Sequence, residues 1–144
     1  MLHVFQSCTR FLLIVVFCLV LPQVAGAKSR TVKNAKPTTL YGAVLHGLRL
    51  IHAGKFDAWI DTFCHADQCT TPKAIKALKQ FNLPTLKRRA EHCLKGKKRL
   101  SIVVTRMVKR PGGVKKIFVK CNPKGSPYPF NLKKEKKAWK WITA

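Results

Sequence analysis

Two carboxylates and a histidine recur at a spacing that could support acid–base chemistry. Asp57, Asp61 and His65 stand at positions i, i+4 and i+8, so they share one helical face if the helix extends that far. A carboxylate beside a histidine can shift the proton affinity of both groups toward neutral pH. A solvated helix face is the competing interpretation, and we favour it because a carboxylate in the first turn stabilises the helix dipole. We therefore expect a binding or structural protein rather than an enzyme.

Four cysteines lie beyond the N-terminal segment, namely Cys64, Cys69, Cys93 and Cys121. An even number in an exported chain predicts two disulfides, for which three pairings exist. We expect Cys64–Cys69 because the pair is local, and Cys93–Cys121 because that bond would tie the last helix to a sheet. A zinc site is the alternative, but the spacing does not support it. We expect no metal and no cofactor.

The first 27 residues have the features of a secretory signal peptide. Arg10 precedes an apolar run at residues 11–21, and Ala25 and Ala27 stand at the A-x-A spacing of a cleavage site. The run is roughly half the length that a membrane-spanning helix needs, which argues against a membrane anchor. We expect cleavage after Ala27 and export to the periplasm or the extracellular space.

The chain carries 29 Lys and Arg against five Asp and Glu, for a formal net charge of +24, or +23 without Arg10. Charge of this size predicts salt-sensitive attraction to anionic polymers or membrane surfaces. The alternative is that the charge has no specific function. Lysine outnumbers arginine, which suits diffuse attraction better than a shaped anion site. The predicted polyanion-binding residues are Lys87, Arg88, Arg89, Lys97, Lys98 and Arg99.

The elements that must position these residues change type along the chain. Residues 28–37 are polar and predict a flexible basic lead-in, and residues 38–144 predict a single domain. Helical apolar spacing predicts four helices, at about residues 39–53, 55–64, 71–81 and 82–95. From Leu100 onward, β-branched alternation predicts a hairpin around "KRPGG", and two further strands joined by the polar turn "KKEKK". Helices followed by an antiparallel meander predict an α+β fold.

The segments "LIHAGKFDAWIDTFC" and "PYPFNLKKEKKAWKWIT" resemble the nuclear transport factor 2-like superfamily, and most closely its small exported bacterial members. The resemblance spans about residues 38–143. It implies N-terminal helices packed on a curved antiparallel sheet that forms a cone-shaped roll with a pocket. Superfamily members include isomerases, dehydratases and transport adaptors, so the fold does not settle the function. An isomerase-like or dehydratase-like enzyme is one alternative that the resemblance keeps open, and dimerisation is another implied property.

Three tryptophans are the predicted wall of that pocket. Trp139 and Trp141 lie two residues apart on a predicted strand, so both indoles point to one face while Lys140 points to the other. Trp59 belongs to the apolar face of the second predicted helix. The ligand of such a pocket, whether a protein or a small molecule, is not specified by these residues.

Overall fold

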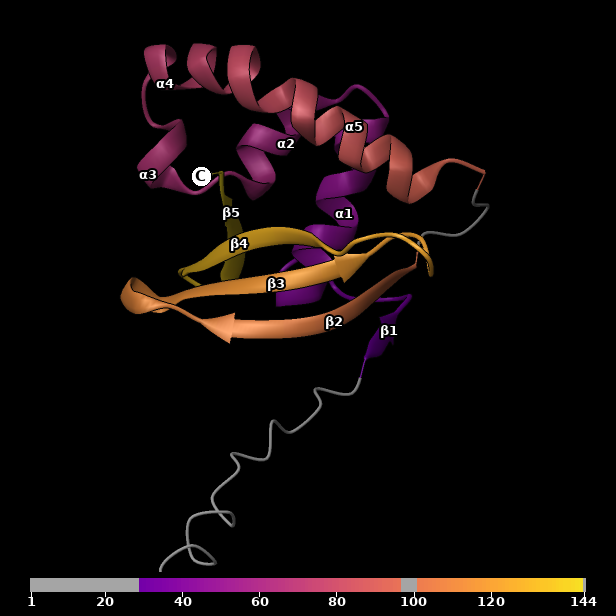
Figure 1. Cartoon of the computed structure of the whole chain (residues 1–144). Helices are drawn as coiled ribbons and strands as arrows, with labels where there is room; N and C mark the ends of the chain where they lie inside the picture. Colours follow the sequence, from indigo (N-terminus) through magenta and orange to yellow (C-terminus); the bar gives the residue numbers. More distant parts are fainter. Residues whose placement is uncertain (1–28, 97–100, 144) are drawn as a thin grey trace, which may run out of the picture.

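The computed structural model describes residues 29–96 and 101–143. The predicted signal peptide and the predicted polyanion-binding residues Lys97, Lys98 and Arg99 lie outside the described residues. Within them, helices form one layer and a curved antiparallel sheet forms the other (Figure 1). The predicted α+β class, with helices packed on an antiparallel sheet, is confirmed.

The helical layer follows the predicted order. Its elements are α1 (Leu40–His52), α2 (Phe56–Phe63), α3 (Ala66–Cys69), α4 (Pro72–Ala77), the π-helical segment η1 (Leu78–Asn82) and α5 (Leu83–Leu94). Thr39 caps α1 by accepting a hydrogen bond from the backbone N–H of Gly42. The short helix α3 lies between the second and third predicted helices, where the sequence predicts no helix.

The third and fourth predicted helices are joined without a break through η1. The N–H of Leu83 donates to the carbonyl of Leu78, five residues back, so the helix widens by one residue at this point. Pro84 follows directly, and in a regular α-helix its ring would clash with the carbonyl four residues back. The wider turn accommodates the proline, and the chain continues where the sequence predicts a boundary.

The sheet has the strand order β1-β2-β3-β4-β5, and all neighbours are antiparallel. Its strands are β1 (Arg30–Val32), β2 (Ile102–Lys109), β3 (Val114–Lys120), β4 (Tyr128–Glu135) and β5 (Ala138–Ile142). A register shift between Val104 and Arg106 marks a bulge in β2, and bulges bend a strand and increase its twist.

Two details of the sheet differ from the sequence prediction. The lead-in contributes the edge strand β1, because Val32 is buried against the core and the segment pairs with β2. The strand β4 extends through Lys133 and Lys134, which the sequence analysis places in a turn. Lys136, with a φ of 53°, lies in the short turn that remains.

The core lies between α1 and the inner face of the sheet. Leu45 and Leu48 from α1 meet Ile117 and Leu132 from the strands, and all four side chains are almost fully buried. At the β5 end, the indole of Trp141 packs edge-on against that of Trp59, with ring centroids 5.4 Å apart. Its Nε1–H donates to the carbonyl of Ala43 at 3.0 Å, which links β5 to the first turn of α1.

The structure brings together the two cysteine pairs expected from the sequence. Cys64 and Cys69 lie 6.2 Å apart at their Cα atoms and close the connection from α2 to α3. Cys93 and Cys121 lie 4.4 Å apart and join α5 to the end of β3. Both Cα separations fall in the range that disulfides occupy. Two disulfides are consistent with an oxidising, exported environment.

Candidate functional site

The predicted acid–base residues are not brought together. The helix α2 ends at Phe63 and the backbone is extended at Cys64, so His65 leaves the face that carries Asp57 and Asp61. Asp57 is largely exposed, and its Oδ1 lies 2.7 Å from Nζ of Lys79. Asp61 is also exposed. These two carboxylates therefore act as surface groups, which is the interpretation that the sequence favours.

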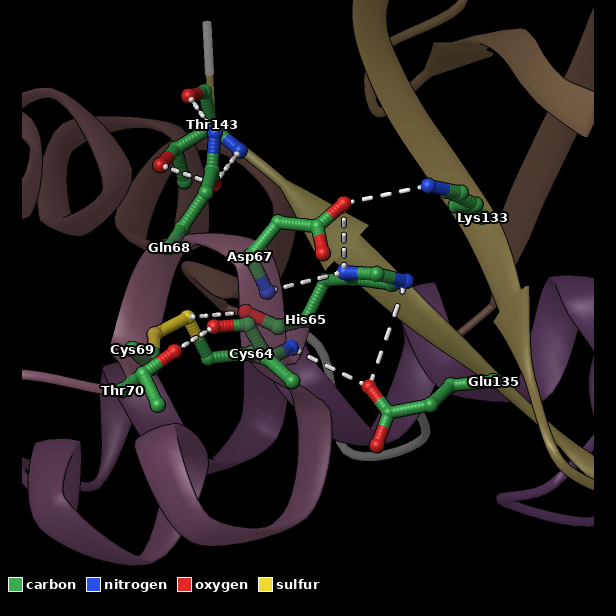
Figure 2. A network of polar contacts seen from close by, with 10 residues as sticks. Cys64, His65, Asp67, Gln68, Cys69, Thr70, Lys133, Glu135 and Thr143 are labelled. Carbon is green, nitrogen blue, oxygen red and sulfur yellow. Dashed lines mark hydrogen bonds and ion pairs between the residues drawn. A yellow bond between two sulfur atoms is a disulfide. The ribbon is translucent and has the colours of Figure 1, made fainter. Parts of the chain in front are cut away.

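His65 instead lies at the centre of a different cluster (Figure 2). Its side chain is buried, and Nδ1 accepts a hydrogen bond from the backbone N–H of Asp67 at 3.2 Å, which caps α3. The Oδ2 atom of Asp67 is 3.3 Å from the same nitrogen, and the Oε2 atom of Glu135 is 4.0 Å from Nε2. The same Glu135 oxygen accepts the N–H of Ala66 at 3.1 Å. The imidazole therefore lies between two carboxylates, one from α3 and one from the end of β4.

Lys133 completes the cluster from the sheet side. Its Nζ donates to Oδ2 of Asp67 at 3.0 Å. This hydrogen bond holds the pKa of Asp67 below its usual value; desolvation acts in the opposite direction, and electrostatic interactions with His65 and Lys133 lower the pKa further.

The chain end is anchored at the same place. The side-chain amide of Gln68 donates to the carbonyl of Thr143 at 2.7 Å and accepts the N–H of Thr143 at 2.6 Å (Figure 2). The N–H of His65 donates to the carbonyl of Trp141 at 3.0 Å. The segment from Cys64 to Cys69 is thus a clasp that holds α3 against β4 and β5.

The geometry of this clasp suits a structural role better than catalysis. The imidazole of His65 is buried, one of its nitrogens is hydrogen-bonded, and the other faces Glu135. Sequence reasoning missed Asp67 and Glu135 as its partners. The spacing of His65 and Asp67 is compatible with a helix cap, but Glu135 is 70 positions away and only the fold brings it near. Among the described residues, no group of three or more His, Cys, Asp and Glu is placed to hold a metal ion.

A groove between α5 and β4 lies beside the predicted basic residues of α5. We call it the α5–β4 groove; its volume is about 320 Å³. Its lining residues are Phe81, Asn82, Thr85, Leu86, Arg89, Pro129, Phe130, Asn131, Trp141, Ile142 and Thr143. A second hollow of about 340 Å³ adjoins it, because Thr85 and Arg89 line both; Arg88 and Tyr128 complete this second lining.

The predicted pocket tryptophans divide between three environments. Trp141 lines the α5–β4 groove. Trp59 is fully buried in the core, where its Nε1 atom has no hydrogen-bond partner among the described residues. Trp139 is half-buried against the core, and Nζ of Lys115 lies 4.7 Å from the centroid of its indole. One of the three indoles therefore has a place in the wall of this groove.

The predicted basic residues on α5 also separate. Lys87 and Arg88 are exposed. Arg89 is half-buried, its Nη1 donates to the carbonyl of Pro129 at 3.3 Å, and its guanidinium lies 5.8 Å from the centroid of the Tyr128 ring. Between described residues, Lys79 and Lys133 are the cations that form ion pairs with aspartates. Within the described ranges, most of the positive charge is therefore left without a carboxylate partner.

No helix in the described part of the chain is long and apolar enough to span a membrane. No family model, curated protein or solved structure matches this sequence. The residues and their geometry are therefore the basis for a functional assignment.

Proposed function

We propose that this protein is an exported, non-enzymatic binding protein whose ligands are anionic polymers. The observation that carries the proposal is the composition of the helical segment formed by α4, η1 and α5, which lies farthest from the sheet (Figure 1). Its exposed basic residues are Lys73, Lys76, Lys79, Lys87 and Arg88. Glu91 is the single acidic residue between Pro72 and Leu94. We call this surface the α4–α5 basic face.

The chemistry of the basic face favours a polymer over a small ion. Its cations are mostly lysines on flexible side chains, which attract charge without a fixed fork geometry. A polymer that neutralises several of them releases its condensed counterions, and this release drives binding at low salt. Of this set, Lys79 is paired with Asp57, and the other cations have no carboxylate partner in the described part of the chain, so they are open to such a ligand.

Export and architecture belong to the same proposal. Two cystine links support an oxidising compartment, and we propose the periplasm or the extracellular space. The order of helices followed by an antiparallel meander supports a nuclear transport factor 2-like architecture with a cone-shaped roll. On the basis of that resemblance alone, we also propose that the protein dimerises. The alternative of a small-molecule enzyme receives less support, because Asp57, Asp61 and His65 lie apart.

Binding of the protein from Lys28 onward to duplex DNA and to heparin, measured at several salt concentrations, tests the proposal. We expect strong binding at low salt and a steep decrease in log K with log salt, with a slope of about −0.9 for each phosphate contact on DNA. A variant with Lys73, Lys76, Lys87 and Arg88 replaced by glutamine should lose up to about four contacts from this slope.

The control variant replaces four exposed lysines outside the basic face with glutamine. These are Lys33, Lys36, Lys109 and Lys124. Its net charge equals that of the first variant, so a smaller loss in the control assigns binding to the basic face. Equal losses would show diffuse attraction by the whole surface instead. Elution of the unaltered protein from heparin at low salt would exclude polymer binding as its function.

A further inference from the structure

We propose that the α5–β4 groove is a second, separate binding site, for a monoanion on a short apolar body of the medium-chain carboxylate class. The carboxylate would lie at Arg89 and the apolar body would extend toward Trp141. This site goes beyond polymer binding on the basic face and does not depend on it. The argument rests on Arg89, on the apolar lining, and on the size and charge of the groove.

Arg89 is held in place before any ligand binds. One N–H donates to the carbonyl of Pro129, and the guanidinium lies 5.8 and 6.0 Å from the ring centroids of Tyr128 and Phe130. An arginine side chain carries five N–H donors in a planar fork. The others have no hydrogen-bond partner among the described residues. A carboxylate can therefore engage a preorganised fork at little cost in side-chain entropy.

The strand geometry explains why this position is open. The strand β5 pairs with β4 from Asn131 to Glu135 only, and Thr143 then turns away to Gln68. The first part of β4 therefore has no β5 neighbour, and α5 lies beside it with Arg89 over Pro129. Proline at this edge has no N–H to donate, which disfavours addition of a peptide strand. The edge is thus better suited to a side-on small ligand than to a peptide.

The remainder of the groove is lined by both apolar and polar residues. Phe130, Trp141 and Ile142 contribute to one wall, and Phe81 stands at the helix side. Phe81 is 69% exposed, which is unusual for so large an apolar side chain and leaves it available for contact. An apolar ligand body between Phe81 and the opposite wall would remove this surface from water.

Size and charge select the ligand class. A volume of about 320 Å³ is at the lower end of ligand sites and holds about ten water-sized groups. Among the described residues that line it, no side chain is a carboxylate and Arg89 is the single cation. One charge at one end and the apolar side chains in the rest of the lining match an amphipathic monoanion. A polyanion could contact one cation in this groove but several on the basic face, so the groove is the less favourable site for a polyanion.

Titration of the protein from Lys28 onward with octanoate tests this site, with tryptophan fluorescence as the readout because Trp141 lines the groove. We expect a saturable change with octanoate and none with acetate, which lacks the apolar body, or with octanamide, which lacks the charge. Arg89→Gln should weaken octanoate binding about tenfold or more, since it removes a charge-assisted hydrogen bond. Phe81→Ser, at an exposed position, should weaken binding as well.

Lys87→Gln is the matched control, because it removes one charge from the same helix at an exposed position outside both hollows. Equal octanoate affinity in the Arg89→Gln and Lys87→Gln variants would overturn the proposal, as would equal binding of octanamide. Heparin retention of the Arg89→Gln variant should stay close to that of the unaltered protein, whereas Lys87→Gln removes one contact of the basic face and should lower heparin retention slightly. Loss of octanoate binding with heparin binding retained, or the reverse, therefore separates failure of this site from failure of the basic face.

Discussion

Replacement of Gly47 by alanine should destabilise this protein, although alanine is the better helix former. Gly47 is buried within α1, next to the two packed indoles. An added Cβ would lie 2.7 Å from Cζ2 of Trp141 and 3.1 Å from Nε1 of Trp59. Atoms at the first distance must move apart. The two tryptophans are almost fully buried, and Trp141 is also hydrogen-bonded to Ala43, so neither indole can move freely.

The magnitude follows from two opposing terms. Alanine stabilises a helix interior by about 1 kcal/mol relative to glycine. Overpacking of a core costs about 1–3 kcal/mol, and the upper part of this range applies because both neighbours are rigid. We therefore expect Gly47→Ala to lower the free energy of unfolding by about 1–2 kcal/mol. In a Trp141→Phe background the smaller ring leaves room, and the same substitution should be neutral or stabilising.

Urea unfolding of the oxidised protein, followed by circular dichroism, measures all four corners of this double-mutant cycle. A coupling of about 2–3 kcal/mol between the two positions is expected, well above the additivity error of such cycles. A higher midpoint for Gly47→Ala alone would refute the close approach of α1 and β5. So would the same change in stability in both backgrounds.

Three further predictions concern the disulfides, the clasp and the cap of α1. Replacement of Cys93 and Cys121 by alanine should lower the free energy of unfolding by about 3.5 kcal/mol, because the disulfide closes a loop with a sequence separation of 28. Replacement of Cys64 and Cys69, with a separation of 5, should lower it by about 2 kcal/mol. Equal losses in urea unfolding would contradict this prediction. Lys133→Met should raise the pKa of Asp67 toward its ordinary value of 3.8. Because the pKa of Asp67 is lowered in the folded state, its hydrogen bond with Lys133 stabilises the protein above the unfolded-state pKa, and this contribution is lost as pH falls through the folded-state pKa. The difference in unfolding free energy between the unaltered protein and Lys133→Met should therefore shrink below about pH 4. A constant difference from pH 2 to 6 would argue against the hydrogen bond. Thr39→Ala should cost about 1 kcal/mol in the same assay and Thr39→Ser almost nothing, since serine keeps the accepting hydroxyl; equal losses would show that the cap does not contribute.

Local signals explain the parts of the fold that the sequence predicts well. The cap at Thr39, the apolar face of Phe56, Trp59 and Phe63, and the hairpin around "KRPGG" each depend on residues close in sequence. Local propensity and periodicity therefore describe them. The cysteine pairs follow from the same reasoning, because one pair is local and the other joins the last helix to the sheet.

The candidate site was less predictable, because it depends on contacts between distant segments. Asp57, Asp61 and His65 have helical spacing in the sequence, but α2 ends before His65, so the three side chains do not share a helix face. The partner of His65 from the sheet, Glu135, comes from the end of β4. No local sequence pattern around His65 or Glu135 predicts that the two side chains lie close together.

The sequence by itself determined the class of the fold, the size of the positive charge and the number of cysteines available for disulfides, since these depend on composition and local pattern. The tertiary structure decided which charges are paired, where the helix continues through η1, and that β1 forms from the lead-in. It also decided that Arg89 lines a groove beside the part of β4 that has no β5 neighbour. The physical reason is that a side chain's partners across the fold are set by packing, and packing is not a property of any one segment.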